Sequence, residues 1–318
     1  MAAVDAGADS VYIGFRSPTN LRNLPGLNFS LDQAGEAVRY AHRNGTKVCV
    51  VVNTHPTNQQ LDDCFGAIDD ACDIGADAVI VADLAVLEHA RNKHQHLEIH
   101  LSCSAGVTDP EAVRFYQEEF GVACVVLPRV LSLQQIAALR QQTDVLLEVM
   151  VFGVLCANYD GNCCLSSFIT GTSANSIGAC SPARFVQFEE TAGDRAVLKL
   201  NGVVIDGSVG PNKRTYPMPC KGKYGNLSRS GRLHTFQDPC CLNALPLLGE
   251  LAAAGVNIMK IEGRQRSLAY VRSVTNVWRN AIDALDRPDN VTTRMFESMS
   301  LEPVLEGMAG TLGALNGG

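Results

Sequence analysis

Four cysteines between residues 156 and 220 could together hold a metal centre. They stand in turn-like surroundings rich in glycine, serine, asparagine and proline: Cys156, Cys163, Cys180 and Cys220. Glycine neighbours let the backbone approach closely and donate N–H bonds to the sulfides of an iron–sulfur cluster. Nearby cations would favour thiolates and offset a cluster's negative charge; these cations are Lys221, Lys223 and Arg184.

The spacing of these cysteines leaves the identity of the metal open. The sequence contains no Cys-x-x-Cys pair, so the usual zinc and ferredoxin patterns are absent. From the residues alone, zinc and an iron–sulfur cluster are both possible, and so is the absence of a metal. Cys164 directly follows Cys163 and could replace it as a ligand.

The remaining cysteines are interpreted mainly as small buried apolar side chains. Those within predicted strands or apolar helix faces are Cys49, Cys72, Cys103 and Cys124. The pattern assigns no role to Cys64, Cys240 and Cys241.

Charged residues at the predicted C-terminal ends of strands form a second group of candidates, because these ends carry the active site of a barrel. The catalytic candidates are Arg129, Arg264, Asp83 and Glu262. Two arginines could clamp a dicarboxylate through paired hydrogen bonds. Asp83, Glu148 or Glu262 could transfer protons if burial raises their pKa values. A structural ion pair or loop hydrogen bond is the alternative for each.

Uncharged and weakly basic residues also follow the predicted strands: Asn53, Thr54, His55, Ser102 and Ser104. For His55 and His100 a structural hydrogen bond is the preferred interpretation. Glu148 lies just before the cysteine loop, where a supporting role is as compatible with its position as catalysis.

A repeated pattern supplies the elements that would position these residues. Four helical stretches each end at a glycine that precedes a short apolar strand; the glycines are Gly7, Gly75, Gly121 and Gly255. Glycine tolerates the left-handed conformation at a helix C-terminus, so each marks a helix–turn–strand joint. Further strands are predicted at 47–53, 98–102 and 146–152. They are apolar throughout, which is typical of strands buried on both faces.

Helix start signals separate these strands. Capping-box and N-cap patterns occur at Ser30 with Gln33, Ser132 with Gln135, and Asp109 with Pro110. Alternating strands and helices imply a parallel sheet. Their number favours a (β/α) TIM-barrel-like core over a doubly wound open sheet, because no glycine-rich phosphate motif follows a strand.

The pattern divides the chain into three parts. We expect residues 1–153 and 243–290 to form the barrel-like core. Residues 154–242 are irregular and form a cysteine-bearing insertion, the candidate iron–sulfur-binding part, and residues 291–318 form a C-terminal tail.

Composition limits the class of protein. The 318 residues are 46% hydrophobic and 19% charged, which suits a large core and argues against disorder. The net charge is −7 without a basic stripe, so no nucleic-acid partner is expected. Apolar runs fall short of the ~18–20 residues of a membrane span, and no signal-peptide pattern is present. We expect a cytoplasmic protein, in which twelve cysteines are not a disulfide framework.

Several motifs resemble those of a known family. Residues 148–156 (EVMVFGVLC), with Gly161-Asn162-Cys163 and Leu165-Ser166-Ser167, are similar to the signature of the collagenase-like "U-thirty-two" (U32) peptidase family. Supporting motifs lie at 12–14, 26–29, 81–85, 126–132, 178–185, 220–224 and 260–267. The resemblance covers nearly the whole chain and is closest to a branch of the family that acts in anaerobic ubiquinone biosynthesis.

The resemblance implies a cofactor, a reaction and partners. It implies a [4Fe–4S] cluster held by four cysteines, which correspond to Cys156, Cys163, Cys180 and Cys220. It implies a heterodimer with a paralogous protein, UbiV, and hydroxylation without O2 of the prenylated aromatic ring of a ubiquinone precursor. For the wider family it implies prephenate as the hydroxyl donor.

The sequence departs from the family pattern at three places. Met1 falls within the helix that usually follows the first strand, so the barrel is expected to lack that strand. Cys103 stands where a polar residue is expected, and Asn158 and Tyr159 replace smaller residues.

Three other functions are compatible with the motifs. An RNA-base hydroxylase of the same family is opposed by the net acidity. A peptidase is opposed by the absence of Gly-x-Ser-x-Gly and His-Glu-x-x-His motifs. A cluster-bearing scaffold or redox sensor would use the same cysteines as an enzyme.

Overall fold

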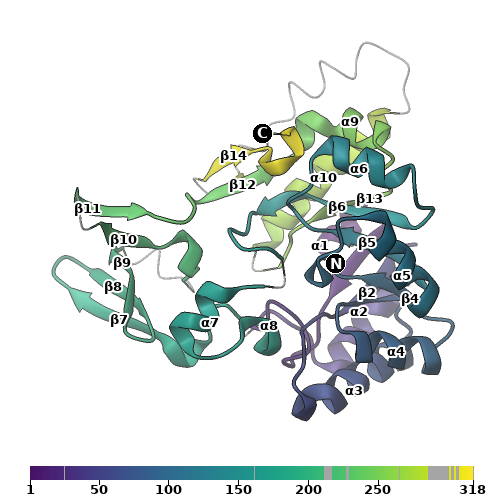
Figure 1. The fold of residues 1–318 in the computed structure, drawn as a ribbon, viewed down its shortest axis with the longest axis horizontal. Coiled ribbons are helices and arrows are strands. Elements are labelled where there is room, and N and C mark those ends of the chain that lie inside the picture. The colour runs from purple at the N-terminus through teal and green to yellow at the C-terminus, as the bar shows by residue number, and fades with distance from the viewer. Residues whose placement is uncertain are drawn as a thin grey trace.

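The larger part of the molecule is a sheet covered by helices, and a lobe of smaller sheets projects from it (Figure 1). The structure is a computed structural model, and it describes residues 1–24, 26–160, 162–210, 217–226, 229–264, 266–285, 301, 304–305 and 308–317.

Parallel strands form the centre of the main sheet. They are β1 (Ser10–Ile13), β2 (Lys47–Val52), β3 (Ala78–Val81), β4 (Glu98–Leu101), β5 (Val122–Leu127), β6 (Leu146–Val154) and β13 (Ile258–Ile261). From β1 to β6 each strand pairs with the next one in the chain, and β13 pairs with β6. Helices alternate with these strands. The predicted (β/α) TIM-barrel-like fold class is therefore confirmed.

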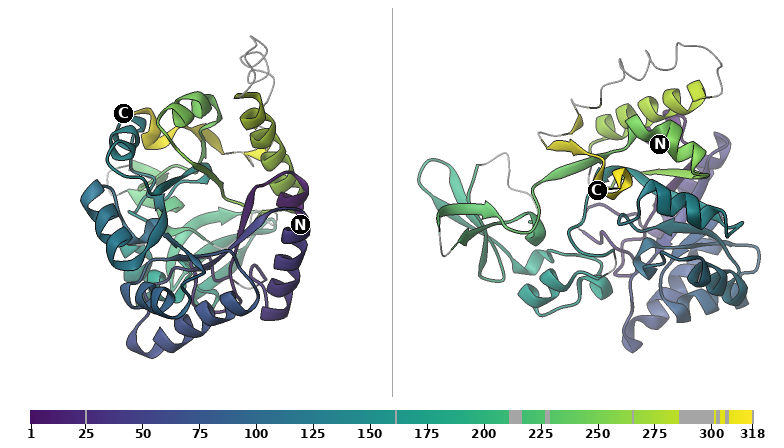
Figure 2. Two further views of the ribbon diagram at one scale, coloured as in Figure 1. Left: turned by 90° about the vertical axis from the view of Figure 1, so that its right-hand side faces the viewer. Right: turned by 45° about the horizontal axis from the view of Figure 1, so that its top comes forward.

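The strands at the two ends of this parallel ladder, β1 and β13, approach each other. The Tyr12 hydroxyl on β1 donates to the Ile261 carbonyl on β13 at 3.4 Å. The Lys260 ammonium lies 4.2 Å from the centroid of the Tyr12 ring. Within the described residues these two strands meet through side chains and not through a backbone ladder. The sheet therefore curves strongly, with its helices around the outside (Figure 2).

The helices of the core are α1 (Ala2–Asp5), α2 (Leu31–Arg43), α3 (Leu61–Asp73), α4 (Leu84–Lys93), α5 (Pro110–Phe120), α6 (Leu133–Arg140), α9 (Leu248–Ala253) and α10 (Leu268–Leu285). Both predicted capping boxes are present, and Asp109 caps α5. The four joint glycines all have positive φ, between 66° and 86°. In the described part of the chain, every helix is too short or too polar to cross a bilayer.

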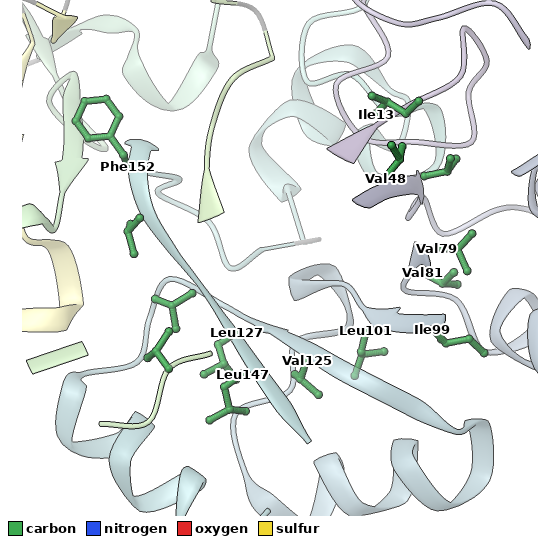
Figure 3. Packing of buried hydrophobic residues seen from close by; sticks show 14 of the residues in the cluster. Ile13, Val48, Val79, Val81, Ile99, Leu101, Val125, Leu127, Leu147 and Phe152 are labelled. Carbon is green, nitrogen blue, oxygen red and sulfur yellow. The ribbon is translucent and has the colours of Figure 1, made fainter. Parts of the chain in front are cut away.

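Two layers of buried side chains fix the core. The outer layer packs the strands against the helices, as Figure 3 shows for Val79, Leu101, Val125 and Leu147 among others. The inner layer lies on the other face of the same strands and contains Cys49, Val51, Ala78, Ile80 and Val126. Alternate residues of one strand thus face opposite sides, which explains why the strands are apolar throughout.

The lobe replaces the barrel pattern after β6. It contains α7 (Cys164–Thr170) and α8 (Ala174–Ile177), and a three-stranded antiparallel sheet of β7 (Val186–Thr191), β8 (Arg195–Leu200) and β9 (Val203–Val209). A two-stranded ladder follows, made of β10 (Lys223–Asn226) and β11 (Arg229–His234). β8 and β9 are separate strands because the chain turns at Asn201 and Gly202, which both have positive φ.

The chain returns from the lobe into the main sheet. β12 (Cys240–Asn243) pairs antiparallel with β6, and β14 (Ala309–Thr311) pairs parallel with β12. The predicted insertion therefore ends inside a strand of the main sheet. The segment predicted as a tail contributes β14 to that sheet, while residues 291–300 lie outside the described residues.

Candidate functional site

The four cysteines singled out in the sequence lie on separate turns at the junction of core and lobe. Cys156 comes directly after β6, and Cys163 is the N-cap residue of α7. Cys180 follows α8, and Cys220 occupies a 3-10 turn. Short elements with glycine-containing ends let the chain reverse between them, which explains why segments far apart in sequence meet here.

These four thiols are close enough to act on one another electrostatically. Burial raises the pKa of the Cys163 thiol to about 11, and Cys180, Cys156 and Cys220 contribute to the same rise. Burial and the Cys156 and Cys180 thiols raise the pKa of Cys220, while Lys221 lowers it. Because each thiolate disfavours its neighbours, a bound cation is needed to hold all four as thiolates.

Hydrogen-bond donors point at two of these sulfurs. The Ser166 backbone N–H bonds to Cys163 and the Ala157 backbone N–H bonds to Cys220, and each bond lowers the thiol pKa. The side-chain amide of Asn158 lies 3.8 Å from the Cys163 sulfur. Such donors stabilise negative charge on sulfur, as metal-bound thiolates require.

The structure distinguishes Cys163 from its neighbour in the chain. Cys164 is the first residue of α7 and is exposed, whereas Cys163 is partly buried. The Cys156, Cys180 and Cys220 thiols contribute to the raised pKa of Cys163. The arrangement thus brings Cys163 together with the other three.

A close backbone contact fixes the Cys180 turn. Gly178 has φ of +77°, and a Cβ atom there would lie 2.1 Å from the Asn20 carbonyl oxygen. The Asn23 N–H donates to the Gly178 carbonyl at 2.9 Å, and the Ser166 hydroxyl donates to the Cys180 carbonyl at 2.5 Å. The loop after β1 therefore holds this turn in place, and only glycine fits the contact.

Five cysteines of the core, on β2, α3, β5, β12 and the turn after β4, are also buried or partly buried. Burial raises the pKa of Cys49 to about 12, that of Cys103 to about 11, and that of Cys124 further. Burial also raises the pKa values of Cys64 and Cys241 to about 11. These thiols stay protonated near neutral pH, as expected for buried apolar side chains.

An ion pair lies at the mouth of the barrel beside the cysteines. The Glu262 carboxylate accepts from Arg22 at 2.7 Å and from the Val154 N–H at 2.8 Å. Burial raises the pKa of Glu262, but Arg22 and this N–H outweigh it, so the net pKa is lowered. Gly153 leaves room for the Glu262 side chain, because a Cβ atom at position 153 would lie 2.5 Å from the Glu262 Cβ. Glu262 is therefore an ionised, paired carboxylate.

Arg129 and Arg264, predicted as a pair, have different partners. The Arg129 guanidinium binds Asp160 through two nitrogens and donates to the Val154 carbonyl at 2.5 Å. Asp160 lies between Cys156 and Cys163, so Arg129 anchors the cysteine loop. Arg264 donates to the Asn20 side chain at 2.8 Å, and its buried Nε has no hydrogen-bond partner among the described residues. The two arginines therefore do not form a clamp on one shared partner in the part of the structure that is described.

Most polar residues at the strand ends hold loops. Asp83 is the N-cap of α4 and accepts from the Ala85 and Val86 N–H groups, which is a structural use of its carboxylate. Asn53 accepts from the Leu21 N–H at 3.0 Å and donates to Ser102 at 3.0 Å.

Other polar residues at the strand ends also make hydrogen bonds within loops. The hydroxyl oxygens of Ser102 and Ser104 lie 3.1 Å apart, and His55 Nε2 lies 3.3 Å from the Ser104 carbonyl oxygen. The Thr54 hydroxyl donates to the Pro18 carbonyl at 3.2 Å.

A charged pair lies inside the barrel below this mouth. Glu148 accepts from Lys260 at 2.6 Å, and both side chains are largely buried. Burial lowers the pKa of Lys260, but Glu148 reverses this and raises it. His100 Nδ1 lies 3.9 Å from Glu148, and burial lowers the His100 pKa. A barrel interior usually contains bulky branched side chains, so a charge pair here is unusual.

Sequence reasoning missed Arg22, Asp160, Lys260 and Tyr12. Lys260 and Arg264 flank Glu262 at alternate positions, a period-two pattern of charges that could have indicated a strand facing a polar interior. Both cations lie over the Tyr12 ring, at 4.2 and 5.6 Å from its centroid. Arg22 sits in an irregular loop, and no local signal indicates its partner 240 positions away.

Comparison with known proteins adds a family match. The model of the family described as Peptidase family U32 matches residues 1–306. The tRNA hydroxylation protein P of Haemophilus influenzae is 30% identical, over 95% of this chain and 68% of that protein.

Two further relatives have related names. The tRNA hydroxylation protein P1 of Bacillus subtilis is 28% identical, over 89% of this chain and 60% of that protein. The 23S rRNA 5-hydroxycytidine C2501 synthase of Escherichia coli is 31% identical, over 89% of this chain and 37% of that protein. The chain therefore spans well under two thirds of the length of both relatives.

Proposed function

The chain belongs to peptidase family U32, and on that premise we propose that it is an iron–sulfur protein of O2-independent hydroxylation. Relatives named as tRNA and rRNA hydroxylation proteins support a hydroxylase-type role. The observation that carries the proposal is the convergence of Cys156, Cys163, Cys180 and Cys220 on one another.

The donor set fits a [4Fe–4S] cluster better than a single zinc ion. A tetrahedral zinc with bonds of about 2.3 Å would hold its sulfurs about 3.8 Å apart. Among the described residues, no three of these four sulfurs lie within 4.8 Å of one another. A [4Fe–4S] cluster would be held by Cys156, Cys163, Cys180 and Cys220 and, being larger than one ion, would accept sulfurs that lie further apart. Such a cluster, when bound, supplies one-electron redox chemistry at a potential set by its surroundings.

The protein residues beside the cysteines would bind and orient an anionic reactant. Arg264 is the candidate contact: its Nη1 is held by Asn20, and its buried Nε has no hydrogen-bond partner among the described residues. Arg22 is paired with Glu262 and Arg129 with Asp160, so these two arginines connect the loops around the site. Below them the Lys260 ammonium donates to the Glu148 carboxylate, which raises the pKa of Lys260 and keeps the proton on the amine. We propose that a carboxylate-bearing hydroxyl donor, prephenate by the family resemblance, contacts Arg264.

The proposed acceptor is the prenylated aromatic ring of a ubiquinone precursor. The motifs around Cys163, Cys180 and Cys220 resemble those of the anaerobic ubiquinone-biosynthesis protein UbiU. By that resemblance the partner is a UbiV-like paralogue in a heterodimer, and the protein acts in the cytoplasm.

The first test measures the cofactor on protein purified without oxygen. We expect about four irons and four acid-labile sulfides per chain, with the absorption of a [4Fe–4S] cluster. Zinc, or a folded protein without metal, would contradict the proposal.

The second test measures the activity in cells. We expect a deletion strain grown without oxygen to lack ubiquinone and to regain it with the wild-type gene. Normal ubiquinone in the deletion strain would contradict the quinone substrate. An Arg264→Lys protein that keeps its cluster and its partner but restores no quinone would favour catalysis over a scaffold role.

RNA-base hydroxylation is the second candidate, favoured by the names of the relatives. The same cysteines would serve it. Mass spectrometry of nucleosides from tRNA and rRNA of the deletion strain separates the two, because loss of one hydroxylated base with normal quinone would select RNA.

A further inference from the structure

A second group of metal-ligating side chains lies on the outer helices, away from the four cysteines. Asp69 on α3 faces His89 on α4 and His94, the residue that ends α4. The Oδ1 atom of Asp69 lies 2.9 Å from His89 Nε2 and 2.6 Å from His94 Nε2. All three candidate ligand atoms lie within 4.8 Å of one another. Two imidazoles and a carboxylate thus converge on one point.

The rings that form this group are held in position. His89 stacks on Phe65 of α3 with centroids 4.5 Å apart and an angle of 9° between the planes. His94 packs edge-on against His89, and only 11% of its side chain is exposed. Because these rings are already fixed, the histidine side chains lose less conformational entropy when they bind an ion.

Two more potential ligands stand next to the group. The ring of His96 lies edge-on to His94, and its Nε2 is 3.3 Å from the sulfur of Cys72 on α3. Three of the seven histidines of the chain therefore fall within residues 89–96 and face one side of α3. Such histidine-rich stretches are typical of metal binding.

We propose that Asp69, His89 and His94 bind a divalent transition-metal ion, with zinc as the best fit. Zinc binds imidazole nitrogen and carboxylate oxygen at about 2.0–2.2 Å, so tetrahedral ligand atoms lie about 3.3–3.5 Å apart. The observed 2.6 and 2.9 Å separations require opening by less than about 1 Å. Water or His96 would complete the coordination. The ion would cross-link α3 to α4.

The charges around Asp69, His89 and His94 predict whether a substitution raises or lowers the affinity for zinc. Lys93 Nζ lies 2.5 Å from the second oxygen of Asp69, and Asp70 and Asp73 lie close on the same helix. Metal binding displaces the proton from each Nε2 and adds positive charge beside Lys93. A Lys93→Gln protein should therefore bind zinc more tightly than the wild type. A plain hydrogen-bond network predicts no zinc binding for this substitution to tighten.

The experiment is a zinc titration of the full chain, purified without oxygen with its native cysteine-site content, against a chelating dye. We expect one zinc per chain that His89→Gln/His94→Gln weakens by at least about tenfold. His42→Gln is the matched control, because the His42 ring lies 2.8 Å from a single carboxylate, that of Asp77, outside the three-residue group. Thermal unfolding should show a zinc-dependent rise in Tm in the wild type, His42→Gln and Lys93→Gln, but not in the double variant.

Two results would overturn the proposal. One is zinc binding that the double substitution leaves unchanged, since the ion would then occupy cysteines elsewhere. The other is no zinc-dependent rise in Tm in either the wild type or Lys93→Gln, a comparison that does not depend on whether the double variant folds.

Discussion

The barrel-like core and the lobe that follows it are stabilised in different ways. The core has a continuous cluster of buried aliphatic side chains on the outer face of its strands. The apolar cluster of the lobe is small, with Ile169, Leu198, Leu200, Ile205 and Val209 as its buried members. The cysteine-bearing turns of the lobe rely instead on single contacts, such as Gly178 against Asn20 and Asp160 against Arg129. A substitution in the core removes only part of the buried apolar area, whereas a substitution at one of these contacts removes the whole contact.

The comparison indicates where a ligand matters. A core of this kind is stable through apolar area removed from water. Turns with few apolar contacts need another source of free energy, and metal binding is a common one. We therefore expect the lobe, and not the barrel, to depend on the proposed cluster.

The largest effect is expected for Cys180→Ala. Loss of one ligand should remove most of the iron and make residues 154–240 sensitive to protease, while the core stays folded. Iron analysis and limited proteolysis of protein purified without oxygen would measure this. Cys164→Ala is the control and should keep its iron, because Cys164 is exposed and outside the group. Equal iron loss in both variants would reassign the ligand.

The second effect concerns a buried ion pair of the lobe. Asp160→Asn leaves the Arg129 guanidinium largely buried without its counter-ion, which should destabilise the protein by about 3 kcal/mol or more. Glu111→Gln breaks the exposed Arg114 pair and should cost less than about 1 kcal/mol. Urea unfolding compares the two. Similar losses of unfolding free energy in the two variants would mean that the buried ion pair stabilises the protein no more than the exposed one.

The third effect concerns backbone fit. Gly178→Ala places a Cβ atom against the Asn20 carbonyl at a left-handed φ, and we expect a loss of about 2–4 kcal/mol together with lower iron content. Gly171 also has positive φ, +67°, but a Cβ atom there meets nothing within 4 Å. Gly171→Ala should therefore cost about 1 kcal/mol, the strain alone. An equally mild Gly178→Ala would show that the Asn20 loop moves freely.

The smallest effect is a pH dependence in the core. Burial lowers the pKa of His100 below its unfolded value of about 6.5. The unfolded chain then binds more protons, so the free energy of unfolding should decrease as the pH falls below about 6.5. In His100→Gln this decrease should be smaller by up to about 1 kcal/mol between pH 6.5 and 5.5. An unchanged pH profile would mean that His100 titrates normally.

The sequence predicted the core well because its signals are local. Apolar runs and helix caps act within a few residues of one another, and Ser30, Ser132 and Asp109 cap the helices as predicted. The lobe was less predictable because its shape depends on contacts between distant segments. Asp83, a candidate for proton transfer, caps α4 in the structure, because a carboxylate after a strand can equally cap the next helix.

The candidate site was likewise predictable from the sequence only in its local features. The four cysteines could be selected by their turn-like surroundings, but their convergence requires tertiary structure. The pairing of Arg129 with Asp160 and of Arg22 with Glu262 joins loops that share no sequence pattern. Two arginines that the sequence makes equivalent therefore have different partners: Arg129 binds Asp160 of the cysteine loop, and Arg264 binds Asn20.

The antiparallel pairing of β6 with β12 has a consequence for how this protein can change over evolution. Val154 and Cys241 are direct partners in that ladder, so the lobe enters and leaves the main sheet through adjacent strands. Loops whose ends are fixed together tolerate changes of length at little entropic cost. Insertions and deletions in the lobe can then accumulate without shifting the barrel strands. New substrate surfaces can thus be tried on an unchanged scaffold.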